Sequence, residues 1–258
     1  MSQIFFELID VVVQFGGLRA LNGLSFQVEQ GSIHAVIGPN GAGKSTVFNC
    51  ISRFYTPVRG DIRFAGRSLL DVPSHGIAKL GIARTFQNIE LCKRLTVLEN
   101  VLVGATSTIP GYVPFWPGRG RIRHEAAAVR EAEALLDSAG LLRFRDTAAE
   151  QLDFGRQKML DVVRALAAKP KLLLLDEPAA GLRNREIDAL DALLVGLARE
   201  RGITIVLVEH VMQLVMSVAD KVTVLNFGEK IAEGKPNEVR ADPDVVEAYL
   251  GRGAHVAG

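Results

Sequence analysis

The sequence predicts an α/β fold built on a parallel sheet, and three observations support that prediction. Residues 38–46 read GPNGAGKST, which fits G-x-x-x-x-G-K-[ST] between a predicted strand at 32–37 and a predicted helix at 46–51. Residues 171–176 form an apolar run ending in Asp176, typical of a strand buried on both faces. From residue 157 onward, helices and apolar strands alternate, which indicates parallel strands joined by right-handed crossovers.

Length and composition limit the functional classes. The chain has 258 residues, of which 48% are hydrophobic, enough for a sizeable core. A formal net charge of +1 gives no electrostatic case for nucleic-acid binding. Cys50 and Cys92 lack metal-ligand spacing and are expected to be buried or free thiols in a reducing compartment. The sequence shows neither a signal peptide nor an apolar run near the ~18 residues of a spanning helix. We therefore expect a cytosolic protein that reaches a membrane only through a partner.

The amino-terminal portion is predicted to be rich in strands. Alternating apolar residues indicate strands over 4–14, 24–29 and 61–66. Ser74 is expected to cap a short helix that runs to Leu80 and ends at Gly81.

The remaining elements are predicted as follows. Helices are expected over 97–104, 122–139, 157–168, 184–200 and 211–218, strands over 171–176 and 203–208, and a hairpin over 222–225 and 230–232. The stretch between 107 and 120 is rich in proline, which excludes a regular helix or a central strand. It contains three aromatic residues within five positions, so it is either a loop or a contact site for a partner.

The segment 38–46 has the residue types of a phosphate-binding loop. Its glycines allow consecutive backbone N–H groups to face one anion, and the following helix adds its positive N-terminal end. Lys44 would neutralise the β- and γ-phosphates, and the Ser45 hydroxyl is a hard oxygen ligand for Mg²⁺. The expected nucleotide-binding residues here are Gly38, Asn40, Gly41, Ala42, Gly43, Lys44, Ser45 and Thr46.

A pair of acids follows the apolar strand 171–176. A carboxylate at the carboxyl end of such a strand lies where open α/β sheets bind ligands. We expect Asp176 to hold Mg²⁺, directly or through water, and Glu177 to polarise the water that attacks the γ-phosphate.

With these motifs, the chain resembles the ATP-binding cassette (ABC) ATPases of membrane transporters over roughly residues 4 to 250. The resemblance implies an α/β P-loop core with a parallel sheet, an N-terminal antiparallel β-subdomain and a helical subdomain. It places the core with its β-subdomain at 1–90 and 165–235, the helical subdomain with the signature motif at 91–164, and a C-terminal helical extension at 236–258.

Three further residues take their roles from the resemblance. Phe15 stands where the family has an aromatic residue that stacks on adenine, although a core phenylalanine is the alternative. Gln87, in RTFQN, matches the glutamine that contacts Mg²⁺ or the attacking water. His210 matches the histidine that hydrogen-bonds the γ-phosphate and orients Glu177. The implied catalytic residues are therefore Glu177, His210 and Gln87, and the implied metal ligands are Ser45, Gln87 and Asp176.

The signature motif departs from the family pattern. Residues 152–157 read LDFGRQ where the family usually has Leu-Ser-Gly-Gly-Gln. Gly155 and the helix that follows are kept, and Asp153 and Gly155 are expected to face the nucleotide held by a second chain. A carboxylate about 4 Å from a γ-phosphate costs roughly 4 kcal/mol per pair of unit charges. Either Arg156 offsets this charge or Asp153 turns outward.

Within the family, the chain most resembles the longer ATPase subunit of bacterial importers of branched-chain or other hydrophobic amino acids. The segments at 12–21, 83–88 and 228–234, the insertion at 107–120 and the ending at 247–251 carry this resemblance. It implies a cytoplasmic ATPase that binds ATP and Mg²⁺, pairs head-to-tail with a second cassette, and associates with permeases and, through them, a solute-binding protein. Two alternatives are a soluble cassette ATPase of repair or translation and a low-activity regulatory nucleotide-binding subunit of a heterodimeric transporter.

Overall fold

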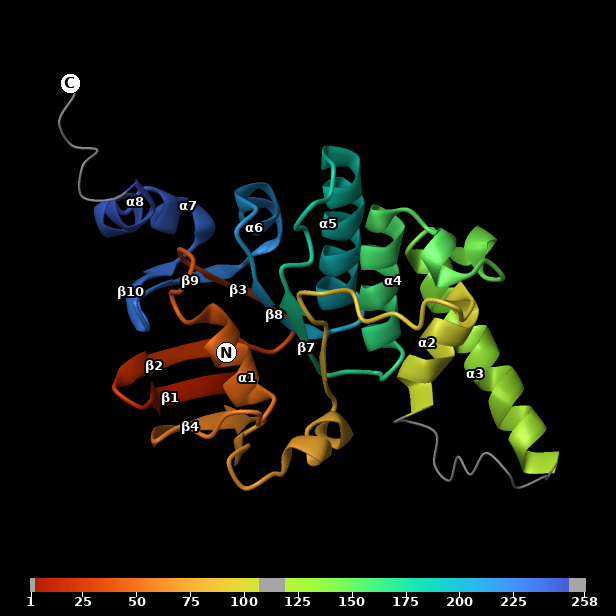
Figure 1. Cartoon of the computed structure of the whole chain (residues 1–258), viewed down its shortest axis with the longest axis horizontal. Coiled ribbons are helices and arrows are strands. Elements are labelled where there is room, and N and C mark those ends of the chain that lie inside the picture. Colours follow the sequence, from red (N-terminus) through yellow and green to blue (C-terminus); the bar gives the residue numbers. More distant parts are fainter. Residues whose placement is uncertain (1–2, 107–118, 251–258) are drawn as a thin grey trace.

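The computed structural model describes residues 3–106 and 119–250. Two sheets and a group of helices make up this part of the chain (Figure 1). Most of the proline-rich stretch 107–120 falls at 107–118, outside the described residues, and residues 251–258 also lie outside them. No helix in the described ranges is both long and apolar enough to cross a membrane.

The core sheet has six strands in the order β10-β9-β3-β8-β7-β6. Their bounds are β3 (Ile33–Ile37), β6 (Ile82–Arg84), β7 (Leu172–Asp176), β8 (Thr204–Val208), β9 (Lys221–Asn226) and β10 (Glu229–Gly234). The strands from β9 to β6 pair in parallel, and β10 pairs antiparallel with β9. All residues of β3, β7 and β8 are buried, as the apolar runs predicted for strands covered on both faces.

A second sheet has four antiparallel strands in the order β2-β1-β4-β5. Their bounds are β1 (Ile4–Phe15), β2 (Leu18–Glu29), β4 (Arg59–Phe64) and β5 (Arg67–Ser68). Helix α1 (Lys44–Ile51) lies between the two sheets, where Val47, Phe48 and Ile51 are fully buried in a core shared with both. The phosphate-binding loop is thereby fixed against two layers.

Helices cover the other face of the core sheet. Their bounds are α5 (Asn184–Arg199), α6 (Met212–Val218), α7 (Pro236–Arg240) and α8 (Pro243–Leu250). Leu173 and Leu175 of β7 point into this second core, whereas Leu172 and Leu174 belong to the first. Successive side chains of β7 therefore point to opposite faces of the sheet and contribute to both cores.

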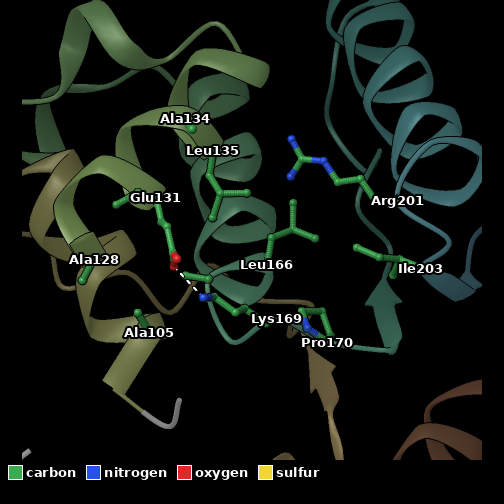
Figure 2. Close-up of a pocket in the computed structure, with 12 residues that line it drawn as sticks. Ala105, Ala128, Glu131, Ala134, Leu135, Leu166, Lys169, Pro170, Arg201 and Ile203 are labelled. Atoms are coloured by element: carbon green, nitrogen blue, oxygen red, sulfur yellow. Dashed lines mark ion pairs between the residues drawn. The ribbon is translucent and has the colours of Figure 1, made fainter. Parts of the chain in front are cut away.

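Three helices form a third group with its own apolar core: α2 (Val97–Ala105), α3 (Arg119–Ser138) and α4 (Phe154–Leu166). The boundary predicted between residues 164 and 165 falls inside α4. This group meets the core sheet at a cleft of about 400 Å³ between α3, the end of α4 and the start of β8 (Figure 2). Glu131 and Lys169 form an ion pair across it, 2.7 Å apart.

Several predicted elements need correction. The helix expected from Ser74 to Leu80 is two short 3₁₀ turns, Ser74–Gly76 and Ala78–Leu80, and Pro73 rather than Ser74 precedes the first. Gly81 does end this segment, with a φ of 90°. Strand β6 was not predicted, because three residues are too short for a periodic pattern.

Candidate active site

The phosphate-binding loop joins β3 to α1 and requires glycine at two close approaches. A Cβ on Gly38 would lie 2.2 Å from the Leu225 carbonyl oxygen, and one on Gly43 would lie 2.7 Å from the Ala20 carbonyl oxygen. Gly43 also has a φ of 102°, in the left-handed region that side chains disfavour. These glycines let the loop turn tightly against β9 and β2.

Lys44 occupies the centre of this loop. Its Nζ donates hydrogen bonds to the carbonyl oxygens of Gly38, at 2.7 Å, and Pro39, at 3.0 Å. Burial lowers the pKa of Lys44, and the nearby carboxylates of Glu177 and Asp176 oppose that effect. The ammonium is therefore held in place over the loop, close to both acids.

The other predicted residues of the loop surround Lys44. Ala42 is buried, and its carbonyl accepts the Gly228 N–H at 3.0 Å, which ties the loop to the β9–β10 turn. Asn40, Gly41 and Ser45 are exposed and Thr46 is half-buried. The helix begins at Lys44, two residues earlier than predicted, so Ser45 and Thr46 lie in its first turn. Their backbone N–H groups are among those an α-helix leaves without an internal partner.

Asp176 ends β7, two strands away from β3, and Glu177 follows it. Asp176 is 5% exposed, and its burial raises the pKa of the carboxyl group, while the Arg84 guanidinium opposes the rise. Glu177 has a positive φ of 49°, a strained conformation for a residue with a side chain. Its backbone N–H donates to the Val208 carbonyl oxygen at 2.9 Å, which continues the β7–β8 ladder and fixes the strained turn.

Gln87 and His210 approach the Glu177 carboxylate from two sides. The Gln87 Nε2 donates to Glu177 Oε2 at 3.1 Å, and His210 Nδ1 lies 3.7 Å from Oε1. Glu177 is therefore in contact with both residues that the resemblance grouped around the reacting phosphate. The amide oxygen of Gln87 remains the atom that could serve a metal or water.

The predicted metal ligands line one open hollow of about 490 Å³, together with Arg84 and Phe86. Ser45, Gln87 and Asp176 supply a hydroxyl, an amide and a carboxylate oxygen, which are the hard donors that Mg²⁺ prefers. No group of three or more His, Cys, Asp or Glu side chains among the described residues could hold a metal alone. Mg²⁺ usually binds through one or two carboxylates plus substrate phosphates, and Asp176 is the carboxylate among the three predicted ligands.

Two residues that sequence analysis did not assign a role organise this region. Glu209 is fully buried and accepts backbone N–H groups from Ala179, His210 and Val211 at 2.7–2.9 Å. Lys158 of α4 donates to the carbonyl oxygens of Glu177 and Gln87 at 3.1 and 3.4 Å. An acid directly after the apolar run 203–208 was a visible signal for Glu209, whereas nothing local marks Lys158.

Phe15 lies at the tip of the β1–β2 hairpin and is 46% exposed. It packs edge-on against Tyr55, with ring centroids 4.9 Å apart. An exposed ring offers an apolar surface for a base, so the structure argues against the alternative of a core phenylalanine.

The structure places Gly155 beside Glu186 of α5, and Asp153 in contact with Arg156 of its own helix. Asp153 is the N-cap of α4: its Oδ1 accepts the Arg156 N–H at 2.9 Å, and its Oδ2 pairs with the Arg156 side chain. Helix α4 therefore begins at Phe154, three residues before the predicted start. Asp153 thus pairs with Arg156, and its side chain is also 51% exposed, so neither of the two expectations is excluded.

Comparison with known proteins establishes the class. A family model described as "ABC transporter" matches residues 21–180, more than half of the chain, so the chain belongs to the ABC transporter family and is an ATPase of that family. A second model, described as "Branched-chain amino acid ATP-binding cassette transporter", matches residues 229–255.

Individual relatives agree with the family. The chain is 41% identical to the high-affinity branched-chain amino acid transport ATP-binding protein BraF of Pseudomonas aeruginosa, covering 97% of this chain and 99% of BraF. The ADP conformation of MJ1267, an ATP-binding cassette of an ABC transporter, has a TM-score of 0.84 at 32% identity and covers 97% and 100% of the two chains. A dimeric structure of the cassette MJ0796 has a TM-score of 0.76 at 27% identity, over 90% and 98%. The predicted ABC ATPase fold is confirmed.

Proposed function

We propose that this chain is the ATP-hydrolysing subunit of an importer for branched-chain or other hydrophobic amino acids. The near full-length similarity to BraF supports the solute class, and the family-model match over 229–255 agrees with it. The importer role places the chain on the cytoplasmic face of the inner membrane, bound through permease subunits that receive the solute from a solute-binding protein.

In the proposed reaction, Lys44 and the backbone N–H groups of the loop bind the ATP phosphates, and Phe15 stacks on adenine. Glu177 accepts a proton from a water molecule as that water attacks the γ-phosphorus. The bond to the β–γ bridging oxygen breaks, which releases ADP and phosphate. Gln87 and His210 hold Glu177 and the water in position. Mg²⁺, held by Ser45, Asp176 and Gln87, would supply positive charge against the β- and γ-phosphates.

The active form is proposed to contain two cassettes. Gly155 lies against Glu186 of α5, and no contact joins the signature turn to Lys44 among the described residues, so in this proposal a second chain brings its own signature turn onto the nucleotide held here. The dimeric structure of MJ0796 provides a precedent among similar cassettes. The proposed occupant of the opposite half is either a second copy or a related cassette.

One observation favours a second candidate function, a low-activity regulatory subunit in a heterodimer. Asp153 keeps a carboxylate at the signature turn, although the Arg156 guanidinium pairs with it. The Asp153 carboxylate would slow hydrolysis at the site it faces if this compensation were incomplete.

The importer function is tested by co-expressing the chain with candidate permeases and a second cassette. Reconstituted into liposomes, the complex should take up radiolabelled leucine only with ATP inside and solute-binding protein outside. ATP hydrolysis without leucine uptake, despite transport of another solute by the same complex, would overturn the proposed solute class.

A further inference from the structure

Arg84, the last residue of β6, has its guanidinium group between α1 and the end of β7. Its Nη2 donates to Asp176 Oδ2 at 2.9 Å, and its Nη1 donates to Asn49 Oδ1 at 2.9 Å and Ser52 Oγ at 3.2 Å. The Arg84 side chain is 11% exposed and that of Asp176 is 7% exposed. One buried side chain thus links the predicted metal-binding carboxylate to the far end of the P-loop helix.

Two aromatic rings fix the plane of this guanidinium. Its central carbon lies 5.4 Å from the ring centroid of Phe48 in α1 and 5.1 Å from that of Phe86. Arginine suits this position because a planar cation can stack on rings and still donate from its edge in two directions. A lysine would keep the charge but could not make the fork.

The next residue holds the same acid from its backbone side. Thr85 Oγ1 accepts the Asp176 N–H at 3.2 Å, and the Thr85 N–H donates to the Leu174 carbonyl oxygen at 2.9 Å. Two residues further on, Gln87 binds Glu177. The segment 84–87 therefore contacts both acids of the site, and each contact is made by a different group.

The ion pair engages only one carboxylate oxygen. With Oδ2 bound to Arg84, Oδ1 is the oxygen left for a ligand in the hollow that Ser45, Gln87 and Asp176 line. A nearly buried carboxylate without a counter-charge is strongly disfavoured as an anion. Arg84 places a guanidinium, which stays protonated, against Oδ2 and thereby fixes the orientation of the carboxylate.

We propose that Arg84 is a positioning residue for the magnesium ligand Asp176: it holds Oδ2 and thereby orients the carboxylate so that Oδ1 serves the metal. This inference rests on the proposed magnesium-dependent function of the site. Arg84 acts through Asp176 and not by touching the nucleotide. The same anchor at Asn49 and Ser52 ties the metal ligand to the helix that begins at Lys44.

The test compares ADP affinity with excess Mg²⁺ and with EDTA, by isothermal titration calorimetry on the purified chain. The readout is the dissociation constant in EDTA divided by the dissociation constant with Mg²⁺. A ratio is used because the loop binds phosphate without metal and a general structural defect would weaken both affinities. Arg84→Met should lower the ratio about tenfold, as expected for loss of a group that orients a metal ligand. Its affinity in EDTA should stay at the wild-type value.

Two further variants make the test specific. Arg84→Lys keeps the charge without the fork and should give an intermediate ratio, and it also serves if Arg84→Met fails to fold. Arg63→Met removes an arginine that pairs with Asp61 in the antiparallel sheet and should leave the ratio unchanged.

Two outcomes would count against the inference. An unchanged or increased ratio in Arg84→Met overturns it, and an unchanged ratio with equal losses of both affinities would assign Arg84 a purely structural role. A wild-type ratio near one would instead show that the proposed metal site itself is wrong.

Discussion

The Glu186 carboxylate occupies the space in which a side chain at residue 155 would begin: a Cβ on Gly155 would lie 2.3 Å from Glu186 Oε1. The other oxygen, Oε2, accepts the Arg183 N–H at 2.8 Å at the start of α5. One carboxylate therefore joins the signature turn of α4 to the loop that follows Glu177. This contact is what favours glycine at 155, since the φ of Gly155 lies outside the positive range.

This contact predicts that Gly155→Ala destabilises the protein by about 1 kcal/mol, the usual value of a helix cap, because Glu186 must leave its position. In a Glu186→Ala background the same change should be neutral or stabilising, since alanine has the higher helix propensity. Urea unfolding of the four proteins measures the coupling. Equal effects of Gly155→Ala in both backgrounds would contradict the steric explanation.

Replacement of Asp153 separates its charge from its capping role. Asp153→Ser and Asp153→Asn both keep a good N-cap, so the free energy of unfolding should change by less than about 0.5 kcal/mol. If the carboxylate attenuates turnover, ATPase rates with the partner cassette present should rise about three- to tenfold, or roughly 0.7–1.4 kcal/mol. Rates equal to wild type in both variants would reject attenuation by Asp153. Asp153→Ala, which loses the cap, controls for stability.

Glu177→Gln should abolish most hydrolysis while leaving nucleotide binding intact. The amide keeps the size of the side chain but cannot accept the proton of the attacking water, so the rate should fall about 10²–10⁴-fold. Phosphate release and ADP affinity are measured on the same preparation. Glu150→Gln, an exposed acid in a 3₁₀ turn outside the site, should behave as wild type. Retention of more than a tenth of the wild-type rate would exclude Glu177 as the general base.

Because His34 is buried, the protein is expected to lose stability in mild acid. Its ring is buried in β3, stacks on Phe26 and lies 2.9 Å from Thr223 Oγ1. Burial lowers its pKa from 6.5 to about 3, an effect that Glu233 opposes and Lys221 and Lys230 reinforce. The unfolded chain therefore binds a proton more readily than the folded one. Stability present above the unfolded pKa of 6.5 is lost as the pH falls toward the folded value.

The magnitude follows from the same two pKa values. Between pH 7.5 and pH 5 the free energy of unfolding should drop by about 2 kcal/mol on account of His34. His34→Gln should show a flatter dependence over this interval, whatever its stability at pH 7.5. Urea unfolding at several pH values gives both slopes. Parallel slopes would show that His34 binds protons equally in the folded and unfolded states and does not cause the loss of stability.

The sequence predicted the elements that have a clear apolar pattern or that carry a known motif. The apolar runs of β7 and β8 are buried on both faces, so their positions could be predicted without knowledge of the partners. The first half of β2 was missed, because register shifts interrupt the alternation between β1 and β2. The start of α4 was also placed too late, although Asp153 is a favourable N-cap residue.

The candidate site was predictable only as a set of separate motifs. Sequence and resemblance identified Asp176 and Glu177, but the pairing of Arg84 with Asp176 joins residues 92 positions apart. No local pattern encodes such a contact, because it depends on β6 lying beside β7 in the sheet. Lys158 also depends on contacts between distant parts of the chain. Its partners are backbone carbonyl groups, which every residue carries and which therefore leave no mark in the sequence.

The hydrogen bonds of Lys44 to its own loop leave the ammonium with one further donor. Two of its three N–H groups donate to the carbonyl oxygens of Gly38 and Pro39, and the residue is only 7% exposed. The position of the charge is therefore set by the loop itself and needs no ligand to fix it. A phosphate that binds the loop would meet a cation already in place, so little side-chain entropy would be lost on binding.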